Sequence, residues 1–228
     1  MEAIISAIEL HVDFVDARPA EPEDILGVHS QIHVDSVSRQ GLYDIAALAA
    51  GGAVLAAEIG MTEPCFAAIR PPGHHASPES CWGFCYFSNI AIAVDHLYRK
   101  GRIRTAHILD FDLHFGDGTN SAIGKRDYVS IHNPVAHDRV AYMDEVRKTL
   151  ENRVADVIAL SAGFDNHKAD WGGVMHTGDY HDIGKLAALA ARRNNGGLFA
   201  VLEGGYNHNV LGKNVLALIQ GMEEGWNL

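Results

Sequence analysis

The segment "ILDFDLHFGDG", residues 108–118, carries an apolar run directly into a cluster of acidic and histidine side chains. The apolar residues before Asp110 predict the end of a buried β-strand. The chemically active side chains crowded there are Asp110, Asp112, His114 and Asp117. Because carboxylates are rarely buried without a partner or a metal ion, we expect a cation-binding site at the end of this strand.

The remainder of the chain alternates helices and short apolar strands. Strands are predicted at 65–69, 105–110, 128–132, 156–161 and 198–203. Helices are predicted at 24–39, 44–60, 89–100, 139–153, 179–194 and 208–221. In the third helix, Ser88 is the expected N-cap and Gly101 the expected stop. Near-continuous apolar strands separated by helices predict an α/β fold, with a central, mainly parallel sheet and helices on both faces.

The length and composition predict a single catalytic domain over residues 1–228, because no linker, repeat or low-complexity tract divides the chain. The net charge of −11, from 29 acidic and 18 basic residues, argues against a nucleic-acid partner and fits a cationic substrate. We expect neither a signal peptide in "MEAIISAIEL" nor a membrane-spanning segment. Three cysteines make no disulfide framework, Cys81 and Cys85 lack the second pair of a zinc ribbon, and a cytoplasmic location is expected.

Functional-looking side chains follow four of the predicted strands. They are His74 and His75 after 65–69, Asp112 and His114 after 105–110, Asp165 after 156–161, and Tyr206 after 198–203. In open parallel sheets, ligands bind beyond the carboxyl ends of the strands. We therefore expect these four loops to converge on one edge of the sheet.

Asp112 and His114 are the best candidates for metal ligands. They lie one residue apart just past a strand, so both can turn toward one cation while Leu113 faces the core. Asp165 offers a third ligand from another strand end. Two carboxylates and one imidazole suit a borderline divalent ion such as zinc, with positions left for water and substrate. The alternative is a hydrogen-bonded acidic cluster without a metal.

His74 and His75, in the loop "RPPGHHASP", form the second candidate group. A Pro-Pro-Gly turn is suited to presenting both rings. A histidine beside a metal-bound water can serve as general base and then as general acid. Asp110 and Asp117 are candidates to orient the two rings. The alternatives are a pair of surface histidines or two further zinc ligands.

Tyr206 follows two glycines, the second of them Gly205, that let the backbone adapt around it. A phenol aimed at a polarised carbonyl would stabilise the developing oxyanion. Phe84, in "WGFCY", is a candidate wall of a narrow apolar slot, with Cys85 behind it. The alternative for each aromatic residue is ordinary packing in a loop or core.

In these motifs the chain resembles the zinc-dependent histone deacetylase family, which includes acetylpolyamine amidohydrolases and acetoin-utilisation proteins. The resemblance runs from about residue 22 to the C-terminus. Its motifs, in the family's order, are "RPPGHHA", "GFCYFSN", "LDFDLHFGDGT", "VSIHNP", "SAGFDNHKADWGG" and "LEGGYN". The resemblance implies the three-layer arginase–deacetylase fold, in which a central parallel sheet carries a metal site at its strand ends.

The resemblance also implies a role for each candidate residue. The implied zinc ligands are Asp112, His114 and Asp165. The implied general base and acid is His75, paired with Asp117, and its electrostatic partner is His74, paired with Asp110. Tyr206 matches the tyrosine that polarises the acyl carbonyl, and Gly83, Phe84 and Gly205 match the substrate channel. A potassium site made largely of backbone oxygens is implied at Asp110, Asp112, His114, Ser130 and Ile131.

The chain departs from the family pattern in three places. The second histidine that usually follows the zinc-ligand histidine is Phe115 here, which should spare the metal because His114 is the implied ligand. The usual N-terminal strand with its Pro-rich region is not found, and the Pro-Gly-Thr-Gly loop after "VSIHNP" is missing. We therefore expect a channel that is more open, or one that a neighbouring subunit completes in a homodimer.

The expected function is a zinc-dependent hydrolase that removes an acetyl or other short acyl group from an amine. The substrate is an acetyl-lysine, an acetylpolyamine or a related small amide, with the acidic surface favouring small cationic amides. One zinc ion per chain is expected, and a potassium ion is implied. Two alternatives stay open: a degenerate deacetylase-like protein that only binds its ligand, and a ureohydrolase-like enzyme with two metal ions.

Overall fold

Five parallel strands form the centre of the computed structural model, which describes residues 1–228. The strands are β1 (Cys65–Ala67), β2 (Ala106–Asp110), β3 (Val129–His132), β4 (Val157–Ala162) and β5 (Gly197–Leu202). Their order across the sheet is β1-β5-β4-β2-β3, and every neighbouring pair is parallel. The prediction of an α/β fold with a central parallel sheet is confirmed.

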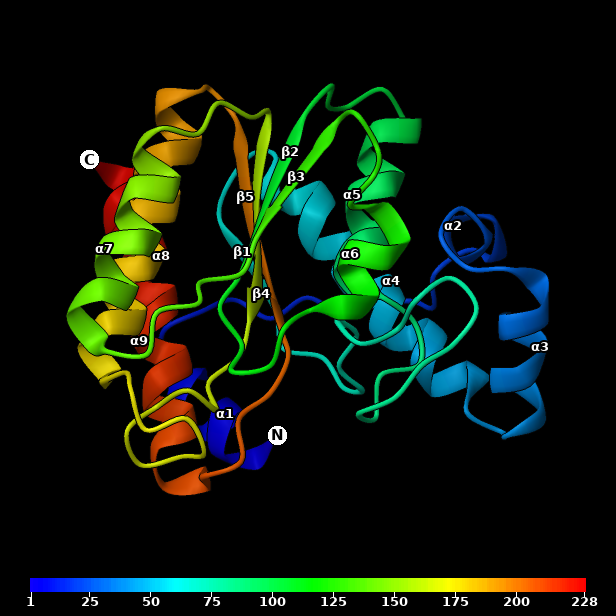
Figure 1. The fold of residues 1–228 in the computed structure, drawn as a ribbon, viewed down its shortest axis with the longest axis horizontal. Helices are drawn as coiled ribbons and strands as arrows, with labels where there is room; N and C mark the ends of the chain where they lie inside the picture. Colours follow the sequence, from blue (N-terminus) through cyan, green and yellow to red (C-terminus); the bar gives the residue numbers. More distant parts are fainter.

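Helices cover both faces of this sheet, so that the molecule has three layers (Figure 1). One layer holds α1 (Glu2–Ile8), α7 (Arg139–Glu151), α8 (Thr177–Arg193) and α9 (His208–Asn227). The other holds α2 (Pro22–Leu26), α3 (Gln31–Arg39), α4 (Tyr43–Gly60), α5 (Asn89–Arg99) and α6 (Asp117–Ile123). Each layer packs a separate apolar core against its own face of the sheet.

The middle strands explain why the apolar runs are continuous. Every residue of β4 is buried, with Ile158 and Leu160 in one core and Val157 and Ala159 in the other. A strand buried on both faces has no solvent side and therefore needs no polar alternation. This burial makes the sheet a rigid support for the loops that leave its carboxyl edge.

The structure corrects several predicted helices. The single helix predicted at 24–39 is two helices, α2 and α3, because the chain breaks after Leu26 and restarts where the Ser30 side chain accepts a hydrogen bond from His33 N. The short helices α1 and α6 were not predicted. Ser88 does occupy the N-cap position of α5, but its side chain makes no capping bond and instead pairs with Thr119.

Helix α4 is long and apolar enough to cross a membrane by length and composition alone. Within the protein it is a core helix: 56% of this segment is buried, and Ala50, Ala53 and Ala57 belong to the core beside β5. One such helix is weak evidence for a membrane span.

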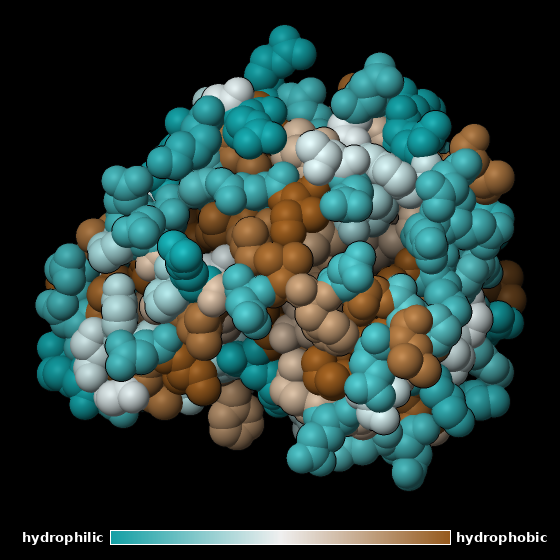
Figure 2. Space-filling model, turned by 180° about the vertical axis from the view of Figure 1, so that it is seen from behind, coloured by the Kyte–Doolittle hydropathy of each residue, from teal (hydrophilic) through white to brown (hydrophobic).

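An apolar groove of about 960 Å³ follows the free edge of β1. Its walls come from α1, α4, α9 and the segment 11–17. Figure 2, which shows the molecule from behind, shows hydrophobic side chains gathered near the centre of that face. Its lining includes Ala68, Ile69 and Arg70, which lead into the loop that carries His74 and His75.

Helices α8 and α9 approach each other through glycine. A Cβ atom on Gly221 would lie 1.9 Å from the backbone oxygen of His181, and one on Gly184 would lie 2.3 Å from that of Leu218. No side chain can yield there, because the nearest atoms belong to the backbone. The close contact of these two helices therefore requires glycine at positions 184 and 221.

We expect Gly221→Ala to lower the free energy of unfolding by about 1–3 kcal/mol, because forced overpacking outweighs the better helix propensity of alanine. Gly178→Ala is the matched control in α8, since nothing lies within 4 Å of its Cβ position. That change should leave stability unchanged or raise it by up to about 1 kcal/mol. Urea denaturation measures both, and equal stabilities for the two variants would contradict the predicted contact.

Candidate functional site

Hydrogen bonds from backbone N–H groups to two carboxylates join three of the carboxyl-edge loops. The Oδ2 atom of Asp112 accepts a bond from Gly204 N at 2.8 Å, which links the loops after β2 and β5. The Oδ1 atom of Asp165 accepts from Leu113 N at 3.0 Å, which links the loops after β2 and β4. The predicted convergence of these loops is confirmed, and buried carboxylates hold it together.

The three predicted metal ligands lie together in this junction. Nδ1 of His114 lies 3.2 Å from Oδ1 of Asp112 and 3.2 Å from Oδ2 of Asp165. The candidate ligand atoms of the three residues all lie within 4.8 Å of one another. A turn in which His114 N donates to Asp112 Oδ1 at 2.9 Å brings the first two residues to the same side. Leu113 does not face the core as predicted, since 37% of it is exposed.

The chemistry of this group fits a divalent cation. Asp165 is fully buried, yet its Oδ2 atom has no hydrogen-bond partner. Burial and the neighbouring Asp112 carboxylate raise the pKa of Asp165 to about 7. A bound cation would supply the missing partner and offset the repulsion between the two carboxylates.

Two glycines make room around these carboxylates. A Cβ atom on Gly163 would lie 2.2 Å from Asp112 Oδ2, and one on Gly204 would lie 2.6 Å from the same atom and 2.9 Å from Asp165 Oδ2. A side chain at position 204 would fill the space beside the free Asp165 oxygen, and one at position 163 would collide with Asp112. The backbone therefore forms a cradle around the candidate ligand atoms.

His75 forms one of the two predicted histidine–carboxylate pairs. Its Nδ1 lies 2.6 Å from Oδ1 of Asp117, at the first position of α6. Trp82 contacts both members: its ring stacks on His75 at 3.7 Å between centroids, and its Nε1–H donates to Asp117 Oδ2 at 2.9 Å. Burial and the charge of His74 lower the pKa of His75, which favours the neutral ring.

His74 forms the other predicted pair. Its Nδ1 lies 3.2 Å from Oδ2 of Asp110, and both residues are buried. Burial alone would disfavour the charged ring, but the carboxylates of Asp110, Glu203 and Asp112 outweigh it and raise the pKa of His74 well above its usual range. The neighbouring histidine rings, with centroids 4.0 Å apart, thus have pKa values displaced in opposite directions.

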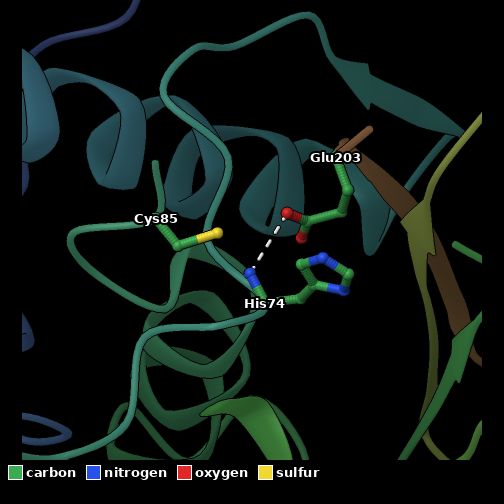
Figure 3. Close-up of side chains that lie close together, drawn as sticks. All are labelled: His74, Cys85 and Glu203. Carbon is green, nitrogen blue, oxygen red and sulfur yellow. Dashed lines mark hydrogen bonds between the residues drawn. The ribbon is translucent and has the colours of Figure 1, made fainter. Parts of the chain in front are cut away.

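Glu203, at the end of β5, supports His74 from behind. Its Oε2 accepts hydrogen bonds from Gly73 N at 2.7 Å and His74 N at 3.1 Å, and its Oε1 accepts from the Ser161 hydroxyl at 2.7 Å. Figure 3 shows the bond to His74 N, with the Cys85 sulfur on the other side of the backbone. Glu203 therefore fixes the turn that carries the two histidines.

His74, Cys85 and Glu203 also lie close enough to form a second candidate metal group. Both carboxylate oxygens of Glu203 already accept hydrogen bonds, and His74 Nδ1 is occupied by Asp110. Burial and nearby Glu203 raise the pKa of the Cys85 thiol, whereas a metal ligand would have to be the thiolate. The free Asp165 oxygen makes Asp112, His114 and Asp165 the better metal group.

Tyr206 lies at the rim of the site, 42% exposed. Asp170 holds its backbone, because Oδ2 of Asp170 accepts from Tyr206 N at 2.9 Å and from Asn207 N at 2.7 Å. Its ring stacks on Trp171 with centroids 4.0 Å apart. Burial and the carboxylates of Asp165 and Asp112 raise the pKa of Tyr206 to about 12, so the phenol stays protonated near neutral pH.

The predicted channel residues form an open rim. Gly83 lies over His75, since a Cβ atom there would be 2.7 Å from His75 Cδ2. Phe84 is 81% exposed and therefore walls no narrow slot within a single chain, although Cys85 is buried as predicted. Gly205, which precedes Tyr206, has φ of +138°, a value that favours glycine. Completion of the channel by a partner subunit stays a prediction.

Of the residues predicted to hold potassium, Asp110 ends β2, Ser130 and Ile131 lie on the neighbouring strand β3, and the other two follow β2 in its loop. Ser130 is paired in register with His107, and Ile131 with Ile108, two positions before Asp110. The Ser130 hydroxyl already lies 2.9 Å from His107 Nδ1. The potassium site stays a prediction.

Four supporting residues were not predicted from the sequence: Trp82, Asp170, Trp171 and Glu203. Glu203 carried a usable signal, because it is a carboxylate at the end of a buried apolar strand, as Asp110 is. The other three lie in loops, where no helical or strand periodicity predicts which residues meet. The folded backbone brings them to their partners.

Comparisons with known proteins identify the relatives of this chain. A family model described as "Histone deacetylase domain" matches residues 38–142. A probable deacetylase of Methanothermobacter thermautotrophicus is 32% identical, over 97% of this chain and 83% of the relative. A histone deacetylase-like amidohydrolase of Pseudomonas aeruginosa is 28% identical, over 89% of this chain and 68% of the relative. The crystal structure of the HDA15 HD domain superposes with a TM-score of 0.83 at 21% identity, over 98% of this chain and 81% of that one, which shows a shared fold.

We expect Glu203→Ala to lower the free energy of unfolding by about 2–4 kcal/mol, because two backbone N–H groups and a hydroxyl lose their buried partner. Glu203→Gln should recover most of this loss, since the amide oxygen can still accept from the Gly73–His74 backbone. Urea denaturation in the presence of a chelator measures the difference without a contribution from metal. Equal losses for both variants would contradict the supporting role.

Proposed function

The chain belongs to the histone deacetylase family, and from this premise we propose that it is a zinc-dependent hydrolase that removes an acetyl or other short acyl group from an amine. The names of its relatives support deacetylase or amidohydrolase chemistry. The metal, the substrate class and the roles of individual residues are our proposal.

One observation carries the proposal: the metal group and both histidine–carboxylate pairs occupy one edge of the sheet. The rings of His75 and His114 lie 6.0 Å apart between centroids. Nε2 of His74 lies 3.8 Å from Oδ1 of Asp112. A cation at the carboxylates would therefore have both histidines beside it, as hydrolysis by an activated water requires.

Asp112, His114 and Asp165 would hold the zinc ion. Zinc, when bound, lowers the pKa of water and polarises a carbonyl group, which is the chemistry that amide hydrolysis needs. The orphaned Asp165 oxygen and the glycine cradle support this assignment of ligands.

His75 is the proposed general base. Its Nδ1–H donates to Asp117, which leaves Nε2 free to accept a proton from the attacking water. The Asp117 carboxylate then stabilises the imidazolium that forms. His75 returns the proton to the departing amine, with the adjacent His74 cation, held by Asp110, providing electrostatic support.

Tyr206 is the proposed hydrogen-bond donor to the developing oxyanion. Its phenol is protonated near neutral pH and therefore retains a hydrogen to donate. The backbone bonds from Asp170 and the stack on Trp171 restrict its position at the rim. A donor fixed in advance costs little reorganisation when the charge develops.

The open rim differs from a long enclosed channel for an acyl-lysine side chain. Together with the net charge of −11, it favours small cationic amides as substrates. Acetylpolyamines and acetyl-lysine peptides therefore belong in the same substrate panel.

We expect the zinc-loaded protein to release acetate from at least one member of this panel. Chelation should abolish the release, and one equivalent of zinc per chain should restore it, because the metal supplies the electrophile. Asp165→Ala should lose both bound zinc, measured by elemental analysis, and turnover. Cys85→Ala is the matched control from the other candidate group and should keep its zinc. Failure of the metal-restored protein on every acyl amide would defeat the proposal.

We expect Tyr206→Phe to lower kcat by about 10²–10³-fold, the usual cost of losing one oxyanion donor. Zinc content and the Kd for an unreactive substrate analogue should change little, because the ring is kept. Steady-state kinetics and calorimetry measure the two effects. A protein that only binds its ligand would instead show no turnover before or after the change.

A further inference from the structure

The Trp82 side chain contacts both His75 and Asp117. Its indole ring stacks on the face of His75, with an angle of 26° between the two planes, and its N–H donates to the carboxylate. His75 and Asp117 are also bonded to each other, so the three side chains form a closed triangle of contacts. Each of the three side chains therefore restrains the other two.

We infer that Trp82 is a positioning residue that aligns the Asp117 carboxylate and the His75 ring for proton transfer. This inference rests on the proposed function. Trp82 is not one of the three candidate metal ligands, and it acts through its two neighbours, His75 and Asp117.

Asp117 requires such a restraint because 49% of its side chain is exposed to solvent. A half-exposed carboxylate bound through one oxygen can rotate and exchange its partner for water. Here Oδ1 bonds to His75 and Oδ2 bonds to Trp82, so both oxygens have a fixed partner. The carboxylate plane, and with it the direction of the His75 Nδ1–H bond, is thereby set.

The stack on His75 has a second consequence. When His75 accepts a proton, its positive ring lies against the electron-rich face of the indole, which is a favourable cation–π arrangement. The same contact covers one face of the imidazole. Trp82 thus stabilises the protonated state of His75 through its ring face, while its N–H group bonds to Asp117.

The backbone around Trp82 is shaped to keep the indole in place. Cys85 N donates to Trp82 O at 3.0 Å, and the two residues between them, Gly83 and Phe84, have φ of +60° and +61°. Positive φ is uncommon for a bulky residue such as Phe84. The tight turn lays Gly83 on the His75 ring and Trp82 alongside it.

Trp82→Phe tests the inference because it keeps an aromatic ring on His75 but removes the N–H donor. We expect kcat to fall about tenfold while KM stays within about twofold, since the substrate loses no contact. Asp117→Asn should cost more, about 10²-fold. If Trp82 acts through Asp117, Trp82→Phe should cause little further loss in the Asp117→Asn background.

Trp171→Phe is the matched control. Trp171 also packs on site residues, stacking on Tyr206 and lying edge-on to His114, but its indole does not bond to Asp117, whose Oδ2 accepts from Trp82. Its effect should therefore multiply with that of Asp117→Asn rather than vanish. Thermal melting and zinc content of every variant verify that fold and metal are retained.

A spectroscopic measurement tests the contact independently of turnover. The chain has three tryptophans, so three indole N–H signals are expected in a ¹⁵N NMR spectrum. The Trp82 signal is identified by its loss in Trp82→Phe. Asp117→Asn should shift this signal and leave those of Trp171 and Trp226 in place.

Multiplying effects of Trp82→Phe and Asp117→Asn, or an unmoved Trp82 signal in Asp117→Asn, would overturn the inference. A raised KM at constant kcat would also overturn it, because Trp82 would then be a substrate contact. If wild-type protein hydrolyses no acyl amide, the proposed function fails and the catalytic role of Trp82 with it. The NMR shift would then still decide whether the bond to Asp117 exists, so the two failures are distinguishable.

Discussion

Two carboxylates buried side by side, Asp112 and Asp165, impose the constraint on which the rest of the site depends. An ionised carboxylate removed from water costs several kcal/mol unless its oxygens are satisfied. Gly204 N and His114 N satisfy Asp112, and Leu113 N satisfies one oxygen of Asp165. The remaining oxygen, Oδ2, accepts no hydrogen bond, although His114 Nδ1 lies 3.2 Å from it. A cation beside His114 completes this arrangement, and the loops that supply the backbone donors are tied to the same point.

The parallel sheet makes this arrangement possible, because it delivers the loops after β2, β4 and β5 to one edge. Around the carboxylates lie two histidine–carboxylate pairs, and each is braced by a further side chain. Glu203 holds the backbone of His74, and Trp82 holds both the His75 ring and Asp117. Such bracing fixes the geometry before substrate arrives, which is how proton-transfer groups and hydrogen-bond donors are made effective.

Features governed by local pattern were predictable from the sequence. The apolar runs located all five strands, and the acidic and histidine residues at their ends identified the side chains that the structure brings together. Features governed by tertiary contact were not. The helix predicted at 24–39 is divided by a break that ends at the N-cap residue Ser30. The Trp82 side chain reaches Asp117 because the turn after it has positive φ at two residues. The exposure of Phe84 likewise depends on what the surrounding loops leave uncovered.

Anomalous diffraction at the zinc absorption edge, from crystals grown with one equivalent of zinc, tests the central claim most directly. We predict one peak about 2.0–2.2 Å from His114 Nδ1 and from oxygens of Asp112 and Asp165, the distances usual for zinc. A peak among His74, Cys85 and Glu203, or no peak at this edge of the sheet, would contradict it.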